Sequence, residues 1–444
     1  MDRHNNSAMT NFKLQRPIKH EWLVFVSAFS VTFLVIGLGY SIGEIFLDVM
    51  DTFNTTRAET AVIQSTALGV GPGSGMLASV LIPKFGVAKS GVFFAVLVSV
   101  GTMACFLATN VWHMMVCFGI IYGLGSTNLT ICAMTAVAQH SKGKTLLILL
   151  SLLQSGVGVG GMVHPYILSY LSEKYGFRGV LLLYGGVYAN IIPGCCLWRM
   201  IKVDQNNENG QTRLQEPFVN SLRAILKNFE FVVFWLGSAI SITWLSIVFI
   251  FIADIFVDKK LRQNDSTFGL FLMHISNVLG RLLPAFTLLK GNIPILWHPF
   301  ITTLISVGGM VGFLFASTRW LILMFCALVG ACFGMFLTML GVISTSIVGV
   351  KRFPLASGLI FTAFGILNSI LGPVVGSIRD SFGTYDIMFY CAIGLTGSAA
   401  TLIAIALIRT RLKSQGLNQQ PDIVESEVSC QREKKNIGVT HNET

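Results

Sequence analysis

Long apolar stretches, separated by short polar breaks, make up most of this chain. A helix of about 20 apolar residues is long enough to cross the hydrocarbon core of a bilayer. Of the 444 residues, 53% are hydrophobic and only 12% are charged, against about a quarter charged in soluble domains. A soluble globular protein is therefore excluded. We count twelve apolar stretches: 22–43, 60–82, 89–109, 111–138, 145–171, 179–198, 231–253, 266–288, 297–316, 319–348, 355–378 and 385–408.

One polar segment, 199–230, is much longer than the other breaks and divides the stretches six and six. The sequence therefore predicts an all-α membrane protein with twelve transmembrane helices in two pseudo-symmetric six-helix bundles. In this division the bundles are 22–198 and 231–408, joined by a cytoplasmic linker at 199–230. Cytoplasmic tails flank them at 1–21 and 409–444, and the second is polar enough to be disordered. Paired bundles of this kind are typical of carriers whose halves rock around a central site.

The charge distribution predicts the orientation. The first 20 residues contain no apolar core of a signal peptide, so we expect the first span to insert uncleaved. An even number of spans places both termini on one side, and a cytoplasmic assignment puts most of the 31 Lys and Arg there, as the positive-inside rule requires. Glycosylation sequons at Asn54 and Asn264 then lie outside. The net charge of +10 therefore indicates orientation rather than a nucleic acid partner, and we expect a multi-pass protein of the plasma membrane.

Enzyme and cofactor motifs are missing from the sequence. It has no phosphate-binding loop, no HExxH motif, no dinucleotide-binding glycine fingerprint and no nucleophile elbow. Its nine cysteines lack the spacing of a disulfide framework or a zinc site. We therefore expect a protein that is not an enzyme and holds no metal or cofactor. A channel, a receptor and an enzyme of lipid chemistry are alternatives, but glycine-rich spans, as at 71–75 and 156–161, favour a carrier whose helices approach closely and slide.

Arg281 is a charged side chain deep within a span. It lies about 15 residues into the stretch 266–288, where a charge costs on the order of 2.5–3.5 kcal/mol. His274, Asn277 and Arg281 follow the spacing i, i+3, i+7 and so share one helix face. Such a polar stripe can bind an anion through the guanidinium group. The alternative is a structural arginine that snorkels to the interface or binds helix-end carbonyls. We favour the functional interpretation, because ionisable groups within a membrane usually mark sites.

Three further residues are candidates for the lining of a central cavity. His164 precedes Pro165, which frees a backbone carbonyl, and a histidine can donate, accept or carry a proton near neutral pH. A hydrogen-bonded core histidine is the favoured alternative. Phe333 and Phe336 would shape the pocket, although packing against lipid or the core is the favoured alternative for both aromatic rings.

Several segments resemble the monocarboxylate transporter family of the major facilitator superfamily, and the resemblance covers nearly all twelve spans. The segment FPLASGLIFTAFGILNSILGPVVGSIRDSFGTYDIMFY is similar to the family's spans 11 and 12, with Asp380 and Gly383 at motif positions. The segment EKYGFRGVLLLYGGVYANIIPGC resembles the turn between spans 5 and 6, where Phe177 replaces the usual tryptophan beside Arg178. The segment IPKFGVAKSGVFFAV is similar to the superfamily's short basic loop. The resemblance implies the major facilitator fold and gating or motif roles for Arg178, Asp380 and Gly383.

Span 8 resembles the family's signature helix, which implies that Arg281 binds the substrate carboxylate. The chain departs from the family's pattern at two positions that bind the proton and the substrate in proton-coupled members. Asn277 stands where proton-coupled members carry Asp, and an amide cannot take up and release a proton. Tyr40 replaces a lysine that these members use with the proton and the substrate. We therefore expect no tight proton coupling, with His164 and Glu44 as alternative proton carriers.

The sequence thus predicts a plasma-membrane carrier of small organic anions, monocarboxylates above all, that works by alternating access. Coupled symport and facilitated diffusion are both open. A carrier of aromatic amino acids or other zwitterions is an alternative, as is a transport-inactive sensor or scaffold with the same fold. The expected partners are the anion, the bilayer and a single-span accessory glycoprotein. Arg281 would bind the carboxylate, and six residues would line the cavity: Asn277, His274, Tyr40, His164, Phe333 and Phe336.

Overall fold

The computed structural model describes residues 19–141, 143–199, 218–261, 263–290 and 297–418, and all regular secondary structure within these ranges is helical. In the N-terminal half the helices are α1 (Lys19–Val31), η1 (Thr32–Ile36), α2 (Gly37–Ser41), η2 (Ile42–Ile45), α3 (Phe46–Phe53), α4 (Arg57–Gly73), α5 (Met76–Phe85), α6 (Val87–Ala104), η3 (Cys105–Leu107), α7 (Val111–Met114), η4 (Met115–Tyr122), α8 (Gly123–His140), α9 (Gly143–Ala189) and α10 (Ile191–Leu197). In the C-terminal half they are α11 (Phe218–Lys227), α12 (Phe229–Asp258), α13 (Gln263–Lys290), α14 (Trp297–Phe315), α15 (Arg319–Phe382) and α16 (Asp386–Asn418).

Two of these helices are interrupted by a single glycine. Gly176 within α9 has φ 65° and ψ 166°, and Gly349 within α15 has φ 76° and ψ 164°. An L-residue with a side chain avoids this backbone region, whereas glycine enters it readily. A straight helix of the length of α15 would extend roughly 95 Å, about three times the hydrocarbon thickness. Each glycine therefore marks the turn between two membrane crossings.

The described residues account for the twelve predicted spans. Nine helical stretches are long and apolar enough to cross a membrane, and the bent pair 62–73 and 76–85 makes a tenth. The stretches 145–197 and 319–379 each contain one of the turn glycines and cross twice. The fold is thus an all-α membrane protein with two six-helix bundles, as the sequence predicts.

The first span is less regular than the continuous stretch 22–43 predicted from the sequence. Between α1 and α3 the chain passes through the π-helical turn η1, the short α2 and the 3₁₀ turn η2. Gly37 in α2 lies so close to α9 that a Cβ atom on it would stand 2.8 Å from the Cα of Gly160. The irregular backbone therefore lies against protein, where its polar groups are shielded from lipid. No proline or polar cluster marks this break in the sequence.

The linker and the C-terminal tail also contain helix. Helix α11 lies within the segment 199–230, and α16 continues beyond residue 409 to Asn418. The side chain of Arg409 lies over the ring of Phe229, with 4.3 Å between the guanidinium carbon and the ring centroid, which holds this part of α16 against the start of α12. The predicted tail 1–21 and the remaining parts of the linker and of 409–444 lie mostly outside the described residues.

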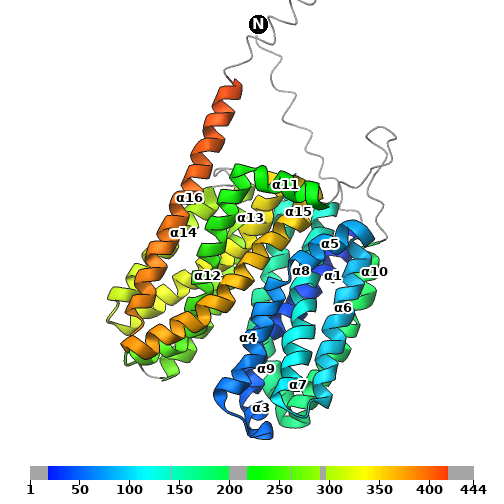
Figure 1. Ribbon diagram of the computed structural model, residues 1–444, viewed down its shortest axis with the longest axis vertical. Helices are drawn as coiled ribbons and strands as arrows, with labels where there is room; N and C mark the ends of the chain where they lie inside the picture. The colour runs from blue at the N-terminus through cyan, green and yellow to red at the C-terminus, as the bar shows by residue number, and fades with distance from the viewer. Residues whose placement is uncertain (1–18, 142, 200–217, 262, 291–296, 419–444) are drawn as a thin grey trace, which may run out of the picture.

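Figure 1 shows the two halves as two bundles side by side, which converge toward the end with α5 and α11 and diverge toward the end with α3. At the convergent end Ser79 Oγ donates a buried hydrogen bond of 2.8 Å to the carbonyl of Pro354. A Cβ atom on Gly75 would lie 3.1 Å from the carbonyl oxygen of Gly358. The second and eleventh spans thus hold the halves together at the end that carries the linker.

Candidate functional site

Arg281 lies in the core of the molecule, at the contact between the two halves. It is only 2% exposed and extends from α13 of the C-terminal half. Its Nε donates to Asn277 Oδ1 at 2.8 Å, and its Nη1 donates to the carbonyl of Gln154 in α9 at 3.1 Å. The guanidinium group therefore binds one neutral oxygen from each half.

Asn277 is held in one orientation by its neighbours. Its Nδ2 donates to the carbonyl of Gly330 in α15 at 3.3 Å, while its Oδ1 accepts from Arg281. A carbonyl can only accept and a guanidinium can only donate, so these two partners fix which end of the amide faces each. The amide thus binds a donor on α13 and an acceptor on α15 at the same time. An ionised carboxylate could not do so, because it has no proton to donate to the carbonyl of Gly330.

No acidic side chain pairs with Arg281 among the residues that the structure describes. The ion pairs found there are Arg319 with Asp265 at 2.9 Å and Arg379 with Asp258 at 3.3 Å. No described group accepts a hydrogen bond from the remaining nitrogen of Arg281, Nη2. A buried cation without a counter-charge is costly, so the site lacks one negative charge.

Helices α9 and α13 run antiparallel past each other at this level. A Cβ atom on Gly158 would lie 3.5 Å from Asn277 Oδ1, and one on Gly161 would lie 3.7 Å from His274 Nδ1. Gln154 precedes Gly158 by four residues and so shares its face toward α13. Its Oε1 is buried and has no hydrogen-bond partner among the described residues. An uncommitted acceptor therefore lies on the same helix face as the carbonyl that binds Arg281.

Aromatic side chains lie next to this polar group. The ring of Phe249 in α12 stands 5.8 Å from that of His274, edge to face, and 5.0 Å from that of Phe333 in α15. Phe333 is 4% exposed and Phe336 is 1% exposed. The structure thus connects His274 and Phe333 through Phe249 and buries Phe336 in the core.

Tyr40 in α2 adds a group from the N-terminal half. It lies close enough to Arg281 for the two groups to interact electrostatically, and it is 41% exposed. A half-exposed phenol can donate a hydrogen bond to a bound anion. Among the described residues no hydrogen bond or ring contact joins Tyr40 to the polar stripe of α13, so a role of Tyr40 in the site stays a prediction.

The structure is that of a membrane protein with a buried cation between two bundles, and none of the described acidic side chains pairs with this cation. A family model described as Major Facilitator Superfamily matches residues 23–354. The chain belongs to this superfamily. The match covers nearly all of the first half and the first four spans of the second, and it identifies the chain as a transporter of this superfamily.

Within the superfamily, the curated relatives are monocarboxylate transporters. The chain is 25% identical to the human "Monocarboxylate transporter 7" over 93% of its own length and 90% of the relative. It is 23% identical to the mouse "Monocarboxylate transporter 6" over 89% of both chains, and 29% identical to the rat "Monocarboxylate transporter 9" over 41% of its own length and 35% of the relative. The resemblance to the monocarboxylate transporter family is confirmed, at low identity.

Solved structures confirm the fold. The chain is similar to the transporter FucP in its outward conformation, with a TM-score of 0.71, 14% identity and coverage of 87% of this chain and 99% of that one. It is similar to the proton:xylose symporter XylE with a TM-score of 0.68, 12% identity and coverage of 86% and 95%. At such identities these structures show the superfamily's fold alone.

His164 lies apart from the Arg281 group. Its Nδ1 bonds to the carbonyl of Gly160 at 2.8 Å within α9, and its ring contacts those of Phe33 and Tyr184 at 5.0 and 5.6 Å. The residue is 1% exposed. It therefore has the surroundings of the packed core histidine that the sequence favoured, inside the N-terminal bundle.

The motif residues stabilise turns within each half. Arg178 follows the turn glycine of α9, donates to the carbonyl of Ala108 at 2.8 Å and lies near the ring of Phe53. Gly383 ends α15 in the left-handed region at φ 76°, with its N–H bonded to the carbonyl of Arg379. The side chains of Asp380 and Glu44 lie outside the described residues. A gating role for Arg178 and Asp380 stays a prediction.

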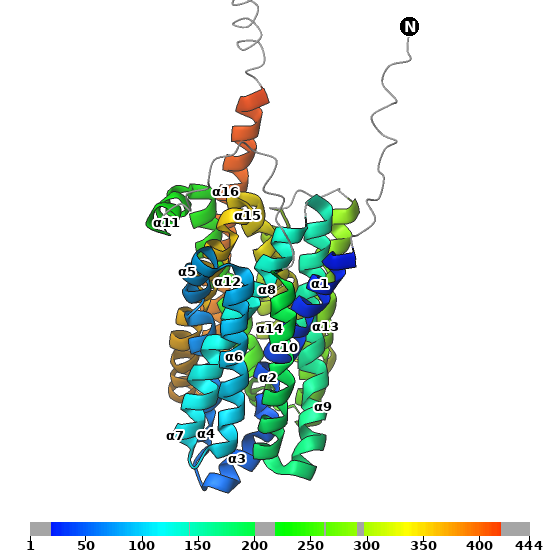
Figure 2. The same ribbon diagram turned by 90° about the vertical axis from the view of Figure 1, so that its right-hand side faces the viewer.

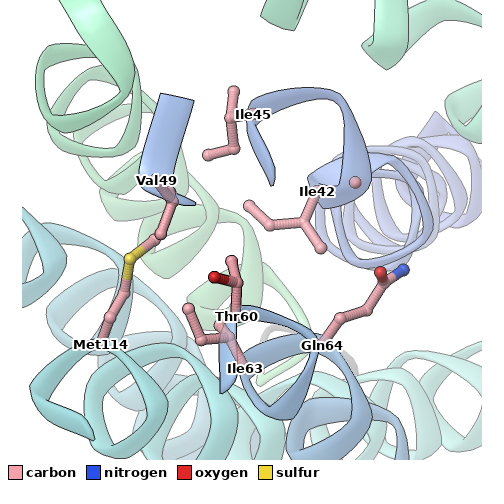
Figure 3. A pocket seen from close by; sticks show the side chains of 8 residues that line it. Ile42, Ile45, Val49, Thr60, Ile63, Gln64 and Met114 are labelled. Atoms are coloured by element: carbon pink, nitrogen blue, oxygen red, sulfur yellow. The ribbon is translucent and has the colours of Figure 1, made fainter. Parts of the chain in front are cut away.

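A small hollow lies in the N-terminal half at the end with α3, away from the linker. Figure 3 shows Thr60 and Gln64 facing Ile42, with Met114 and Val49 at its edge. It borders the irregular part of the first span, and none of the predicted site residues lines it. Its lining from the first span comes from residues that follow Tyr40, in and after the irregular part of this span. The hollow is therefore distinct from the proposed anion site at Arg281.

Gln154 and Phe249 are the residues of the site that the sequence did not indicate. Both lie in apolar stretches without a charge or a motif. Gln154 has one weak signal, because it is a polar amide within the span 145–171. Phe249 has none, since it is one of 33 phenylalanines.

Proposed function

We propose that this transporter carries small monocarboxylates across the plasma membrane, with both termini cytoplasmic. The relatives' names support the substrate class, and the charge distribution of the loops supports the orientation. The observation that carries the proposal is the guanidinium group of Arg281, which is buried and, within the described part of the chain, bonded to neutral oxygens alone. A substrate carboxylate supplies the missing charge and accepts hydrogen bonds from a planar fork that fits its two oxygens.

Alternating access follows from the position of this cation. Arg281 belongs to α13, and its Nη1 binds the carbonyl of Gln154 in the other half. A carboxylate at Arg281 competes for the Nη1 donor that bridges the halves, so binding changes the free energy of the contact between them. A ligand shifts such an equilibrium by its difference in affinity for the two states.

Proton coupling has no carrier at position 277. Asn277 is neutral, and both ends of its amide are engaged. We therefore propose facilitated transport driven by the substrate's own gradient. An inward pH gradient that drives accumulation of substrate above equilibrium in the wild-type protein would contradict this and indicate symport.

The test is uptake of labelled lactate and pyruvate in oocytes, with surface amount measured by biotinylation. We expect Arg281→Gln to reduce uptake at least thirtyfold, because loss of one partner of a buried charge pair costs about 2 kcal/mol or more. Arg281→Lys keeps the charge but not the fork, and we expect it to restore only part of the rate. The matched control is Arg319→Gln, whose side chain is 49% exposed and pairs with Asp265. Unchanged uptake of every anion by Arg281→Gln would contradict the proposal.

A second candidate substrate is an aromatic amino acid. The aromatic contacts from His274 through Phe249 to Phe333 favour it, since they place ring surfaces next to His274 of the polar stripe on α13. Competition of tryptophan and phenylalanine against labelled lactate distinguishes the two. Absence of all uptake at normal surface amount, also with a co-expressed single-span accessory glycoprotein, would indicate a transport-inactive sensor instead.

A further inference from the structure

Helix α11 lies across the linker end of the C-terminal half, and Figure 2 shows it extending beyond the side of the bundle near the labelled part of α15, while α16 continues past this level. It rests against α12 and α15. Ile225 is buried, and Phe218 and Leu222 pack beside it against the core. This face holds the helix on the bundle.

The side of α11 next to this face is apolar and exposed. Val219 is 67% exposed and Leu226 is 44% exposed. At about 100° per residue, these two side chains project from nearly the same side of the helix, about a quarter turn from the face formed by Phe218, Leu222 and Ile225. Val219 and Leu226 therefore project sideways from the helix, along the end of the bundle. This direction lies in the plane of the membrane surface.

Basic side chains continue around the helix from this edge. Arg223 and Lys227 are both exposed, and their i, i+4 spacing puts them on one face. Arg409 of α16 is exposed as well and covers the ring of Phe229 just beyond the end of α11. Among the described residues next to them, the acidic group is Glu230, which is partly buried. The exposed surface formed by Arg223, Lys227 and Arg409 is therefore positively charged.

An apolar edge beside a basic face is the pattern of a helix that lies in the membrane interface, with its apolar side chains among acyl chains and its cations at the phosphates. From this arrangement we propose that α11 binds anionic phospholipids of the leaflet on the linker side. Val219 and Leu226 contact the acyl chains, and Arg223 and Lys227, with Arg409 beside them, bind the headgroup phosphate. The complementary charge selects an anionic lipid over a zwitterionic one.

The experiment is native mass spectrometry of the full-length protein titrated with phosphatidylserine or phosphatidylcholine. We expect wild type to retain phosphatidylserine preferentially. Arg223→Gln/Lys227→Gln should bind it on the order of thirtyfold more weakly, since each cation near the surface contributes about a fivefold preference. Phosphatidylcholine binding should not change. The matched control removes two exposed charges from the other half, Lys84→Gln/Lys89→Gln, and should change the preference less.

A second variant separates a lipid surface from a site for phosphate alone. Val219→Ser/Leu226→Ser keeps both charges, so binding of soluble glycerophosphoserine should be unchanged while binding of phosphatidylserine falls. Equal retention of the two lipids by wild type, or an unchanged preference in Arg223→Gln/Lys227→Gln, would overturn the proposal. If Val219→Ser/Leu226→Ser bound glycerophosphoserine and phosphatidylserine equally more weakly than wild type does, the site would bind phosphate without membrane contact. This result would also overturn the proposal. A melting midpoint equal to wild type in phosphatidylcholine shows that each variant is folded.

Discussion

Arg281 Nε donates to Asn277 Oδ1 at 2.8 Å, one helical turn apart on α13, and the same amide donates through Nδ2 to Gly330 at 3.3 Å. The cation is thus oriented by a neutral group that α15 holds in place. An amide stabilises the guanidinium geometry without neutralising its charge. The arrangement keeps the charge of Arg281 available for a ligand.

Asn277→Asp should convert this available cation into an internal ion pair. The carboxylate competes with the substrate for Arg281 and loses the donor to Gly330, so we expect uptake at neutral pH to fall about tenfold or more, mainly through a higher KM. Concentration dependence of uptake in oocytes measures it. The comparison is Asn277→Leu, which loses both hydrogen bonds but adds no charge and should lower the maximal rate instead. Equal KM values for Asn277→Asp and wild type would contradict the assignment.

The sequence predicts the spans and the stripe on α13 because both depend on local spacing. The residues at i, i+3 and i+7 share a face in any α-helix, and His274, Asn277 and Arg281 do so here. The partners of that stripe come from other helices, and no local pattern encodes which residue of α9 or α12 lies opposite. Gln154 and Phe249 were therefore missed. The irregular first span was missed for the same reason, since it lies where Gly37 meets Gly160.

Gln154→Leu tests whether the buried amide of Gln154 serves transport or packing. Its Oε1 has no partner in the described structure, and an unsatisfied buried acceptor costs about 1–3 kcal/mol. We expect Leu to leave the thermal midpoint in detergent equal or higher, while uptake falls several-fold because a polar group beside Arg281 is lost. A drop in both stability and uptake would indicate a packing role alone. Gln64→Leu, in the outer hollow of Figure 3, is the control.

Gly334→Ala should separate α13 from α15. A Cβ atom there would stand 3.1 Å from the Cα of Asn277 and closer still to its carbonyl carbon, at 2.9 Å, so the helices must shift. Overpacking of this kind costs about 1–3 kcal/mol, and the shift displaces Asn277 and with it Arg281. We expect a lower melting midpoint together with weaker uptake. Gly308→Ala in α14, where nothing lies within 4 Å, should change neither.

Tyr385 should make the stability of the C-terminal half depend on pH, at the end of the bundle away from the linker. It lies in the turn before α16, where burial and then the Asp254 carboxylate raise the pKa of its phenol from 10.0 to about 12. The unfolded chain loses this proton at lower pH than the folded one, so stability should fall as the pH rises from about 10 to about 12. Tyr385→Phe removes this fall and the hydroxyl contact with Asp254, but keeps the ring under Arg379. Tyr390→Phe, which is 60% exposed, should behave as wild type in melting curves across this pH range.

Gly358→Leu should weaken the contact that holds the halves together at the linker end. A Cβ atom on Gly358 would lie 3.2 Å from the carbonyl carbon of Gly75 and closer to other atoms of the second span, so a larger side chain excludes the observed arrangement of α4, α5 and α15. If this contact is destabilised by about 1.4 kcal/mol, the ratio of the state closed at the linker end to the state open there changes tenfold. We expect maximal uptake to fall, and a cysteine introduced at the buried Ser79 to react faster with an impermeant thiol reagent applied from the linker side of inside-out vesicles. Gly376→Leu, which meets no atom within 4 Å, controls for side-chain size in the same helix. Equal reactivity of the cysteine with and without Gly358→Leu would show that this contact does not close the linker side.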